Sequence, residues 1–189
     1  MIDVKNYIFV HVPKTGGQSI KHALGGKTKE WPTHIPLSAI QKYNRYAFGF
    51  VRNPWDRMVS LYHFLCQKAM KHDDNFNQLE VRAAGFKYWL MKHNFFMKED
   101  YRWSKGNLSP MQRRTQLFWL EGCDFIGCFE NLGFDLQFAC KRIGIKSPNK
   151  LSVANTTKHK YYREYYDNET IGHVAEHFAP EIEMMGYSF

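Results

Sequence analysis

Three short, largely apolar runs stand out along the chain, separated by segments in which apolar residues recur at helical spacing. The runs are Tyr7–Val12, Tyr46–Val51 and Asp124–Phe129. Near-continuous hydrophobicity over about four to eight residues is typical of strands that are buried on both faces, as in a parallel sheet. We therefore expect these runs to form three strands of such a sheet.

The segments between and after these runs predict helices. One helix should extend from about Gln18 to Leu24 and stop at the glycine pair that follows. In another, Asn53 can cap the helix and Pro54 suits its first position. Further helices are expected at about 77–97, at 110–121, in a segment ending near residue 144, and at 168–178. Strands and helices alternate, which indicates an α/β protein with right-handed crossovers and a mainly helical middle third.

The composition is that of a globular protein, with 44% hydrophobic and 23% charged residues. No repeat, low-complexity tract or Gly/Ser-rich linker divides the sequence, so we expect one domain over residues 1–189. Basic side chains outnumber acidic ones by 26 to 18, which gives a net charge of +8. This excess favours an anionic partner, whether a nucleic acid, an acidic polysaccharide or a small molecule that carries phosphate or sulfate.

Cysteine usage and the absence of long apolar windows suggest the compartment. The cysteines form no CxxC pair and have no metal-ligand spacing with histidine, so free thiols in a reducing compartment are expected. They are Cys66, Cys123, Cys128 and Cys140. The sequence does not open with a secretory pattern, and no window approaches about 18 uncharged apolar residues. The expectation is a cytoplasmic protein without a membrane span.

The first candidate functional feature is the loop Val12-Pro-Lys-Thr-Gly-Gly-Gln-Ser19, between the first strand and the first helix. Its glycines allow a tight turn that brings amide N–H groups close to an anion, and the helix adds its positive dipole end. Lys14 supplies a full charge, and Thr15 and Ser19 add hydroxyl groups. The alternative is an ordinary strand-to-helix turn with a surface lysine. We favour anion binding because the donors are concentrated in one loop.

This loop differs from the Walker A motif of nucleotide triphosphatases, in which four residues separate the glycines and Gly-Lys-Ser/Thr follows. Here Lys14 precedes the glycines. The second strand also ends in Arg52, and not in an aspartate that would hold Mg²⁺. The expected fold is α/β and P-loop-like, with three layers in which helices flank a central parallel sheet. No metal is expected in its site.

The second feature is Arg52-Asn-Pro-Trp-Asp-Arg-Met-Val-Ser60, which begins at the carboxyl end of a strand, where α/β folds place their ligands. Ser60 lies eight residues beyond Arg52, about 12 Å along a helix. A ligand near Ser60 could therefore lie against the helix flank and meet the arginine. The alternative makes Arg52 an ion-pair partner at a helix end and Ser60 a solvent-facing residue.

Together, the strand–PKTGG–helix element and the following strand–RNPWDRMVSLY element resemble the paired phosphate-binding signatures of sulfotransferases. These enzymes use 3′-phosphoadenosine-5′-phosphosulfate (PAPS) as donor and release adenosine 3′,5′-bisphosphate (PAP). The chain is similar to the carbohydrate branch, which includes heparan-sulfate 2-O- and chondroitin-type sulfotransferases. Further landmarks of the resemblance are Gln116-x-x-Trp-Leu120, Asp124–Asn131 and Gly186–Phe189. The segment at about 68–105 matches least.

The resemblance implies a role for each matched residue. The first signature would hold the 5′-phosphosulfate, with residues Lys14, Thr15, Gly16, Gly17, Gln18 and Ser19. Arg52 and Ser60 would hold the 3′-phosphate, and Lys158 would belong to a late loop that closes over the nucleotide. Gln18 departs from relatives, which commonly carry a hydroxyl residue there. The membrane anchor of Golgi relatives is also missing from the sequence.

Sulfuryl transfer needs a cation for the leaving oxygen and a base for the acceptor hydroxyl. Lys14 is the candidate cation. His34, in an irregular segment before the second strand, is the candidate base, since the 2-O-sulfotransferase branch has a catalytic histidine in a similar place. His11 precedes the loop but lies in a predicted strand, which favours a packed, hydrogen-bonded side chain. Glu130, at another strand end, is a weaker candidate.

The resemblance implies a hydroxyl-bearing, carbohydrate-like acceptor. The basic net charge of the chain is compatible with an acidic acceptor of this class. Two other functions remain to be separated from this one. A nucleotide-dependent kinase would share the fold class and a phosphate loop, but it would require Mg²⁺ and aspartate ligands. An RNA-binding module would need aromatic and basic residues interleaved on one surface, whereas most aromatic residues here fall at core spacing. We expect no nucleic-acid partner, and the sequence leaves the oligomeric state open.

Overall fold

The computed structural model describes residues 1–3, 6–25, 34–69, 85–91, 115–148, 151 and 159–189. The chain divides into two compact units. The first unit comprises Met1–Arg52 and Gln116–Thr156, and the second comprises Asn53–Thr115 and Thr157–Phe189.

The first unit is built on a four-stranded sheet with the strand order β1-β2-β3-β4. Its strands are β1 (Ile2–Asp3), β2 (Tyr7–Val10), β3 (Tyr46–Val51) and β4 (Phe125–Cys128). β1 pairs antiparallel with β2, whereas β2, β3 and β4 run parallel to one another. The register places Phe9 beside Phe48 and Phe48 beside Phe125. The expected central parallel sheet is confirmed, and β1 is an addition that the apolar pattern did not predict.

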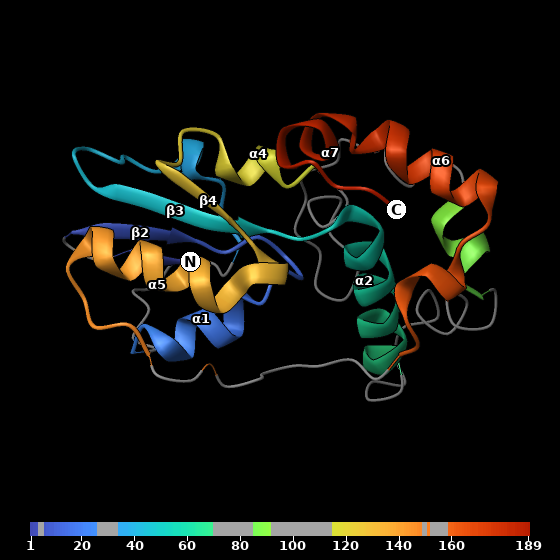
Figure 1. Ribbon diagram of the computed structural model, residues 1–189, viewed down its shortest axis with the longest axis horizontal. Coiled ribbons are helices and arrows are strands. Elements are labelled where there is room, and N and C mark those ends of the chain that lie inside the picture. The colour runs from blue at the N-terminus through green and yellow to red at the C-terminus, as the bar shows by residue number, and fades with distance from the viewer. Residues whose placement is uncertain (4–5, 26–33, 70–84, 92–114, 149–150, 152–158) are drawn as a thin grey trace. The chain divides into compact units, whose positions relative to one another are not determined.

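Helices cover both faces of this sheet, as the ribbon shows (Figure 1). Helices α1 (Gly17–Ala23) and α5 (Leu132–Ile143) cover the face whose side chains form an aromatic core with Phe9 and Phe48. Helix α4 (Leu117–Leu120) lies against the opposite face, where a Cβ on Gly49 would fall 2.2 Å from Leu120 Cδ2. The α/β fold with helices around a parallel sheet is therefore confirmed.

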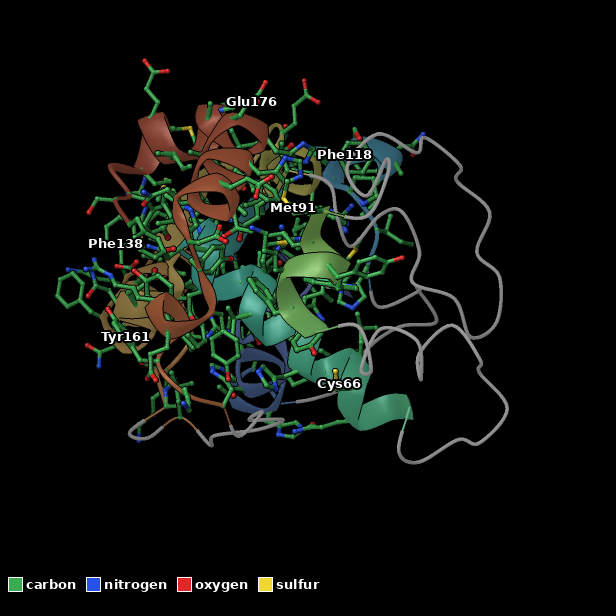
Figure 2. The ribbon with its side chains drawn as sticks, turned by 90° about the vertical axis from the view of Figure 1, so that its right-hand side faces the viewer. Cys66, Met91, Phe118, Phe138, Tyr161 and Glu176 are labelled. Carbon is green, nitrogen blue, oxygen red and sulfur yellow. The ribbon has the colours of Figure 1, made fainter. Side chains whose placement is uncertain are left out.

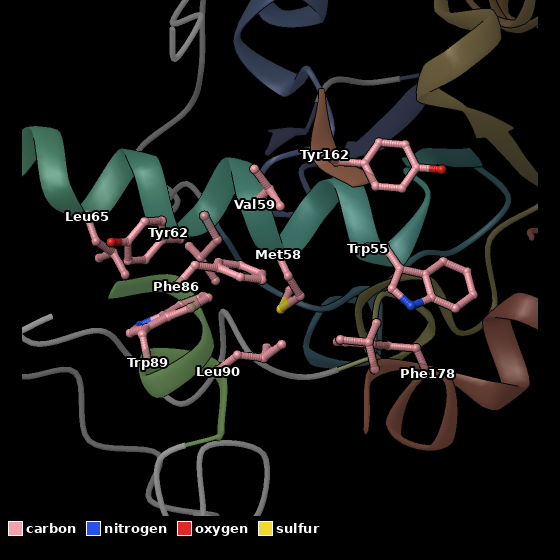
Figure 3. Packing of buried hydrophobic residues seen from close by; sticks show 12 residues of the cluster. Trp55, Met58, Val59, Tyr62, Leu65, Phe86, Trp89, Leu90, Tyr162 and Phe178 are labelled. Atoms are coloured by element: carbon pink, nitrogen blue, oxygen red, sulfur yellow. The ribbon is translucent and has the colours of Figure 1, made fainter. Parts of the chain in front are cut away.

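The second unit is helical and has a core of its own. Its elements are α2 (Pro54–Ala69), a helical segment at 85–91, η4 (Tyr162–Tyr165), α6 (Asn168–His177) and α7 (Ala179–Met185). Apolar residues of α2 pack against the segment 85–91 and against Tyr162 and Phe178 (Figure 3). The side chain of Phe189, at the end of the chain, packs on Trp55 with 5.7 Å between ring centroids.

Local signals account for most helix ends. The Asn53 Oδ1 accepts hydrogen bonds from the backbone N–H groups of Trp55 (3.1 Å) and Asp56 (3.4 Å), which confirms the expected cap of α2. Helix α5 stops at Gly144, whose φ of 71° is left-handed, as expected for a C-terminal glycine. Asp167 caps α6 by accepting from the backbone N–H of Thr170.

Two helix predictions were less accurate. Of the segment predicted at 110–121, only Leu117–Leu120 is α-helical among the described residues, and 110–114 lie outside them. The helix predicted at 77–97 is seen at 85–91, with the remainder outside the described residues. The last predicted helix, at 168–178, is followed directly by α7, because Pro180 begins a new helix after Phe178.

Aromatic side chains supply much of both cores, and only some remain on the surface. Phe138 on α5 is 45% exposed and Tyr161 is 60% exposed (Figure 2). Phe138 also packs on Phe125, with 4.8 Å between ring centroids. Within the described part of the chain, none of the helices combines the length and the apolar character needed to span a membrane.

Candidate active site

The loop between β2 and α1 has a backbone conformation suited to binding an anion. Lys14 and Gly16 both adopt left-handed φ values, 70° and 76°, and the Thr15 hydroxyl donates to the carbonyl oxygen of Val12 at 3.0 Å. Where residues of left-handed conformation alternate with residues of other conformations, successive backbone N–H groups point into one concave space that can hold an anion. A left-handed conformation costs a non-glycine residue about 1–2 kcal/mol, and such strain concentrates at functional sites.

The two glycines of this loop are required by their surroundings. A Cβ on Gly17 would lie 1.9 Å from Cδ2 and 2.1 Å from Nε2 of His11. A Cβ on Gly16 would lie 3.0 Å from Leu132 and 3.1 Å from Phe129, in addition to the strain of its positive φ. The loop is therefore packed closely against the residues beneath it, which fixes its backbone.

His11 is the residue on which Gly17 rests, and its side chain is only 4% exposed. Its ring stacks on Phe9, with 6.0 Å between centroids. Burial lowers the pKa of His11 well below its ordinary value of 6.5, and the neighbouring His34 lowers it further. His11 follows the end of β2 at Val10, and its buried Nδ1 has no hydrogen-bond partner among the described residues. The expected packing of His11 is confirmed, and its expected place within the strand was wrong by one residue.

His34 lies beside His11 in the same unit. The two ring centroids are 4.5 Å apart, and His34 Nδ1 is 2.9 Å from the carbonyl oxygen of His11. A carbonyl oxygen can only accept, so the hydrogen bond requires the proton of a neutral His34 to be on Nδ1. Nε2 then carries a lone pair, which is the form of imidazole that can accept a proton from a hydroxyl group.

Arg52 follows the last residue of β3 and reaches toward the loop. Its Nη1 donates to the carbonyl oxygen of Lys14 at 3.3 Å, and its Cζ lies 4.3 Å from the centroid of the Phe129 ring. The side-chain amide of Gln116 holds the main chain of Arg52, accepting from its N–H and donating to its carbonyl oxygen, each at 2.8 Å. In the first unit Arg52 thus contacts the loop of Lys14, and His34 packs on His11, the residue that lies against Gly17 of the same loop.

The other candidate residues have different surroundings. Gln18 is half-buried on α1 and Ser19 is buried there, whereas Glu130 is exposed in η3 (Phe129–Asn131). Ser60 lies on α2 in the second unit and is 4% exposed, so the alternative that it faces solvent was wrong. Lys158 lies outside the described residues.

Sequence reasoning did not find the residues that hold the site together. Gln116 and Phe129 were noted only as parts of landmarks, and His11 only as a packed side chain. The sequence signal for Gln116 is a polar residue directly before the apolar run Leu117–Leu120. Its side chain is 0% exposed, and a buried amide group needs hydrogen-bond partners. Nothing in the sequence places Phe129 against Arg52.

The comparison with known families agrees with this geometry. A family model described as the sulfotransferase family matches residues 1–188. The chain belongs to the sulfotransferase family. No curated protein and no solved structure gives a significant match. Membership, which covers nearly the whole chain, supports sulfuryl transfer to a hydroxyl-bearing acceptor as the general activity of this sulfotransferase.

Proposed function

We propose that this sulfotransferase transfers the sulfuryl group of PAPS to a hydroxyl of a carbohydrate and releases PAP. The observation that carries the proposal is the position of Arg52 beside the Lys14 loop. Each follows one of two adjacent parallel strands, β2 and β3, at the carboxyl edge where α/β proteins bind ligands. Two cationic groups and a nest of backbone N–H donors at this edge suit a nucleotide with separate phosphate groups.

The donor would lie across both signatures. The loop from Lys14 to Ser19 would hold the 5′-phosphosulfate, with its backbone N–H groups as donors. Arg52 would hold the 3′-phosphate, because a guanidinium group matches phosphate geometry and is always charged. Family resemblance adds Ser60 to the 3′-phosphate contacts and Lys158 to the loop over the nucleotide.

The reaction would be an in-line displacement at sulfur. The acceptor oxygen forms a new S–O bond while the bond from sulfur to the bridging oxygen of PAPS breaks, and the electron pair of that bond stays with the phosphate of PAP. Lys14 would stabilise the negative charge that develops on the bridging oxygen. The proton of the acceptor hydroxyl would pass to Nε2 of His34.

The surroundings of His34 support its role as the base. The carbonyl oxygen of His11 orients the imidazole through Nδ1, at 2.9 Å, and leaves Nε2 unprotonated. A positioned base of this kind contributes about 10²–10⁴-fold to a rate. Glu130 remains the alternative base if His34 is not required.

The acceptor class follows from resemblance to the carbohydrate branch and from charge. The chain carries a net charge of +8, which would attract an acidic polysaccharide more strongly than a neutral sugar. The proposal is therefore a polysaccharide acceptor with carboxylate or sulfate groups.

The test is transfer of ³⁵S from labelled PAPS to a panel of acceptors, without added metal. The panel pairs acidic polysaccharides with a neutral polysaccharide and with simple phenols. We expect label in an acidic polysaccharide and an equal amount of PAP, and we expect the Lys14→Ala variant to lose both. Label in phenols alone would contradict a carbohydrate acceptor. ATP with Mg²⁺ serves as the parallel donor, and phosphate transfer from it would favour a kinase.

A further inference from the structure

We infer that Gln116 is a positioning residue that sets Arg52 for the 3′-phosphate of the donor. The inference rests on the proposed function, since it deepens the role of Arg52. Gln116 is fully buried, at 0% exposure, and its side chain bonds to the backbone of Arg52. It acts through Arg52, without contact to the nucleotide.

Arg52 lies beyond the last paired residue of β3 on both sides, by one residue on the β4 side and by three on the β2 side. The ladder with β4 ends at Val51, opposite Cys128, and the ladder with β2 ends at Gly49, opposite Val10. Backbone N–H and C=O groups that are shielded from water at the end of a strand need hydrogen-bond partners. The amide of Gln116 supplies both partners at 2.8 Å and so extends the sheet by one residue.

Two bonds to one residue fix the peptide planes on either side of its Cα. The N–H of Arg52 belongs to the preceding peptide plane and its C=O to the following one, so the Gln116 amide restrains both φ and ψ. The direction of the Cα–Cβ bond is then set. From that direction the guanidinium lies over Phe129 and donates to the carbonyl oxygen of Lys14.

The position of the pair in the chain adds a second reason. The chain leaves the first unit after Arg52 and returns to it at Gln116. The amide therefore binds the backbone of Arg52 at the point where the chain leaves the first unit. With it, Arg52 stays in the frame of the sheet, where the Lys14 loop also lies. A guanidinium group held in this way loses less side-chain entropy when it binds phosphate.

A purely structural role for Gln116 makes a different prediction. Loss of buried hydrogen bonds would lower stability in either case, so stability alone does not separate the two roles. Selectivity for the 3′-phosphate does. PAP and adenosine 5′-monophosphate (AMP) differ only in that group, so the ratio of their dissociation constants reports on how well Arg52 is placed.

The experiment compares Gln116→Met with Leu120→Ala in the full chain. Methionine has nearly the volume of glutamine. It lacks both the amide oxygen that accepts from the N–H of Arg52 and the amide N–H that donates to its C=O. Leu120 is buried on the same segment, against Gly49, and has no bond to Arg52. Both variants should have a lower melting temperature. We expect the preference for PAP over AMP to fall about tenfold in Gln116→Met and to be unchanged in Leu120→Ala.

An unchanged preference in folded Gln116→Met would overturn the inference, as would an equal fall in Leu120→Ala. If Gln116→Met does not fold, Gln116→Glu replaces it. Glutamate keeps an acceptor for the N–H of Arg52 and lacks the amide donor for its carbonyl oxygen. Its preference should then fall between those of the wild type and Arg52→Ala, and a wild-type preference would overturn the inference. Failure of the wild type to prefer PAP would instead contradict the proposed function.

Discussion

The guanidinium group of Arg52 donates a hydrogen bond to the carbonyl oxygen of Lys14, with 3.3 Å between Nη1 and O. The bond joins two signatures that lie 38 positions apart in the chain. It also acts on a residue whose left-handed φ of 70° is unusual for lysine. The cation assigned to one phosphate of the donor thus helps to fix the loop assigned to the other.

Removal of the Arg52 side chain should mainly weaken the hold on the 3′-phosphate. A hydrogen bond to a charged group is worth about 1.5–3 kcal/mol, so the affinity of Arg52→Ala for PAP should fall about 10- to 150-fold. Its affinity for AMP should fall less. Calorimetric titration measures both. Arg142→Ala is the matched control, because it removes the same charge from the first unit, where Arg142 lies over Tyr46. Equal losses for PAP and AMP would show that Arg52 serves another phosphate.

Gly17 should not tolerate even one methyl group. The Cβ of Gly17→Ala would fall 1.9 Å from the His11 ring, and overpacking of this kind costs about 1–3 kcal/mol. We expect lower stability in urea and weaker PAP binding. His11→Ala in the same chain should restore part of the stability by making room. Gly133→Ala is the control, because a Cβ there meets nothing within 4 Å. No recovery in the double variant would argue against the close contact of His11 and Gly17.

Stability should depend on pH through His11. Burial lowers its pKa well below 6.5 in the folded state, so the unfolded state binds the proton first as the pH falls. The stabilising effect of the neutral ring is therefore complete above about pH 6.5 and is lost below it. His11→Phe should lose less unfolding free energy than the wild type between pH 7.5 and about 5.5, as measured by urea titration. His63, whose pKa is also lowered by burial, should account for part of the remaining change. Equal losses in both proteins would contradict the buried, neutral state of His11.

The sheet and the tight loop after β2 could be predicted from sequence because local signals specify them. Apolar runs give the strands, and the Lys14 loop combines turn residues with donors. The short strand β1 was missed because two residues carry no pattern. The helix predicted at 110–121 was misleading for Gln116, which bonds to Arg52 and precedes the α-helix.

Contacts between distant residues could not be predicted in the same way. The ring of His11 against Gly17, the ring of Phe129 against Arg52 and the amide of Gln116 all depend on tertiary packing. His34 was chosen by resemblance, and its position beside His11 followed only from the fold. The division into two units also has no linker composition that marks it in the sequence.

The base assignment predicts a separation of rate from binding. His34→Asn keeps an amide donor that can replace Nδ1 in the bond to the His11 carbonyl oxygen, but it has no group equivalent to Nε2. Its turnover should fall by about two to four orders of magnitude while its affinity for PAP stays near that of the wild type. His22→Ala, which changes an exposed histidine of α1, should have normal turnover. Normal turnover in His34→Asn would move the base to another residue, with Glu130 the next to test.

The most direct test of the account is calorimetric titration of the full chain with PAP in the presence of EDTA. We expect the positive charges of Lys14 and Arg52, together with the backbone N–H donors of the loop, to bind PAP without a divalent metal. We predict saturable binding at one site, tighter than the binding of AMP, with a matching rise in melting temperature. Absence of binding, or binding of ATP that requires Mg²⁺ in place of PAP, would contradict the account.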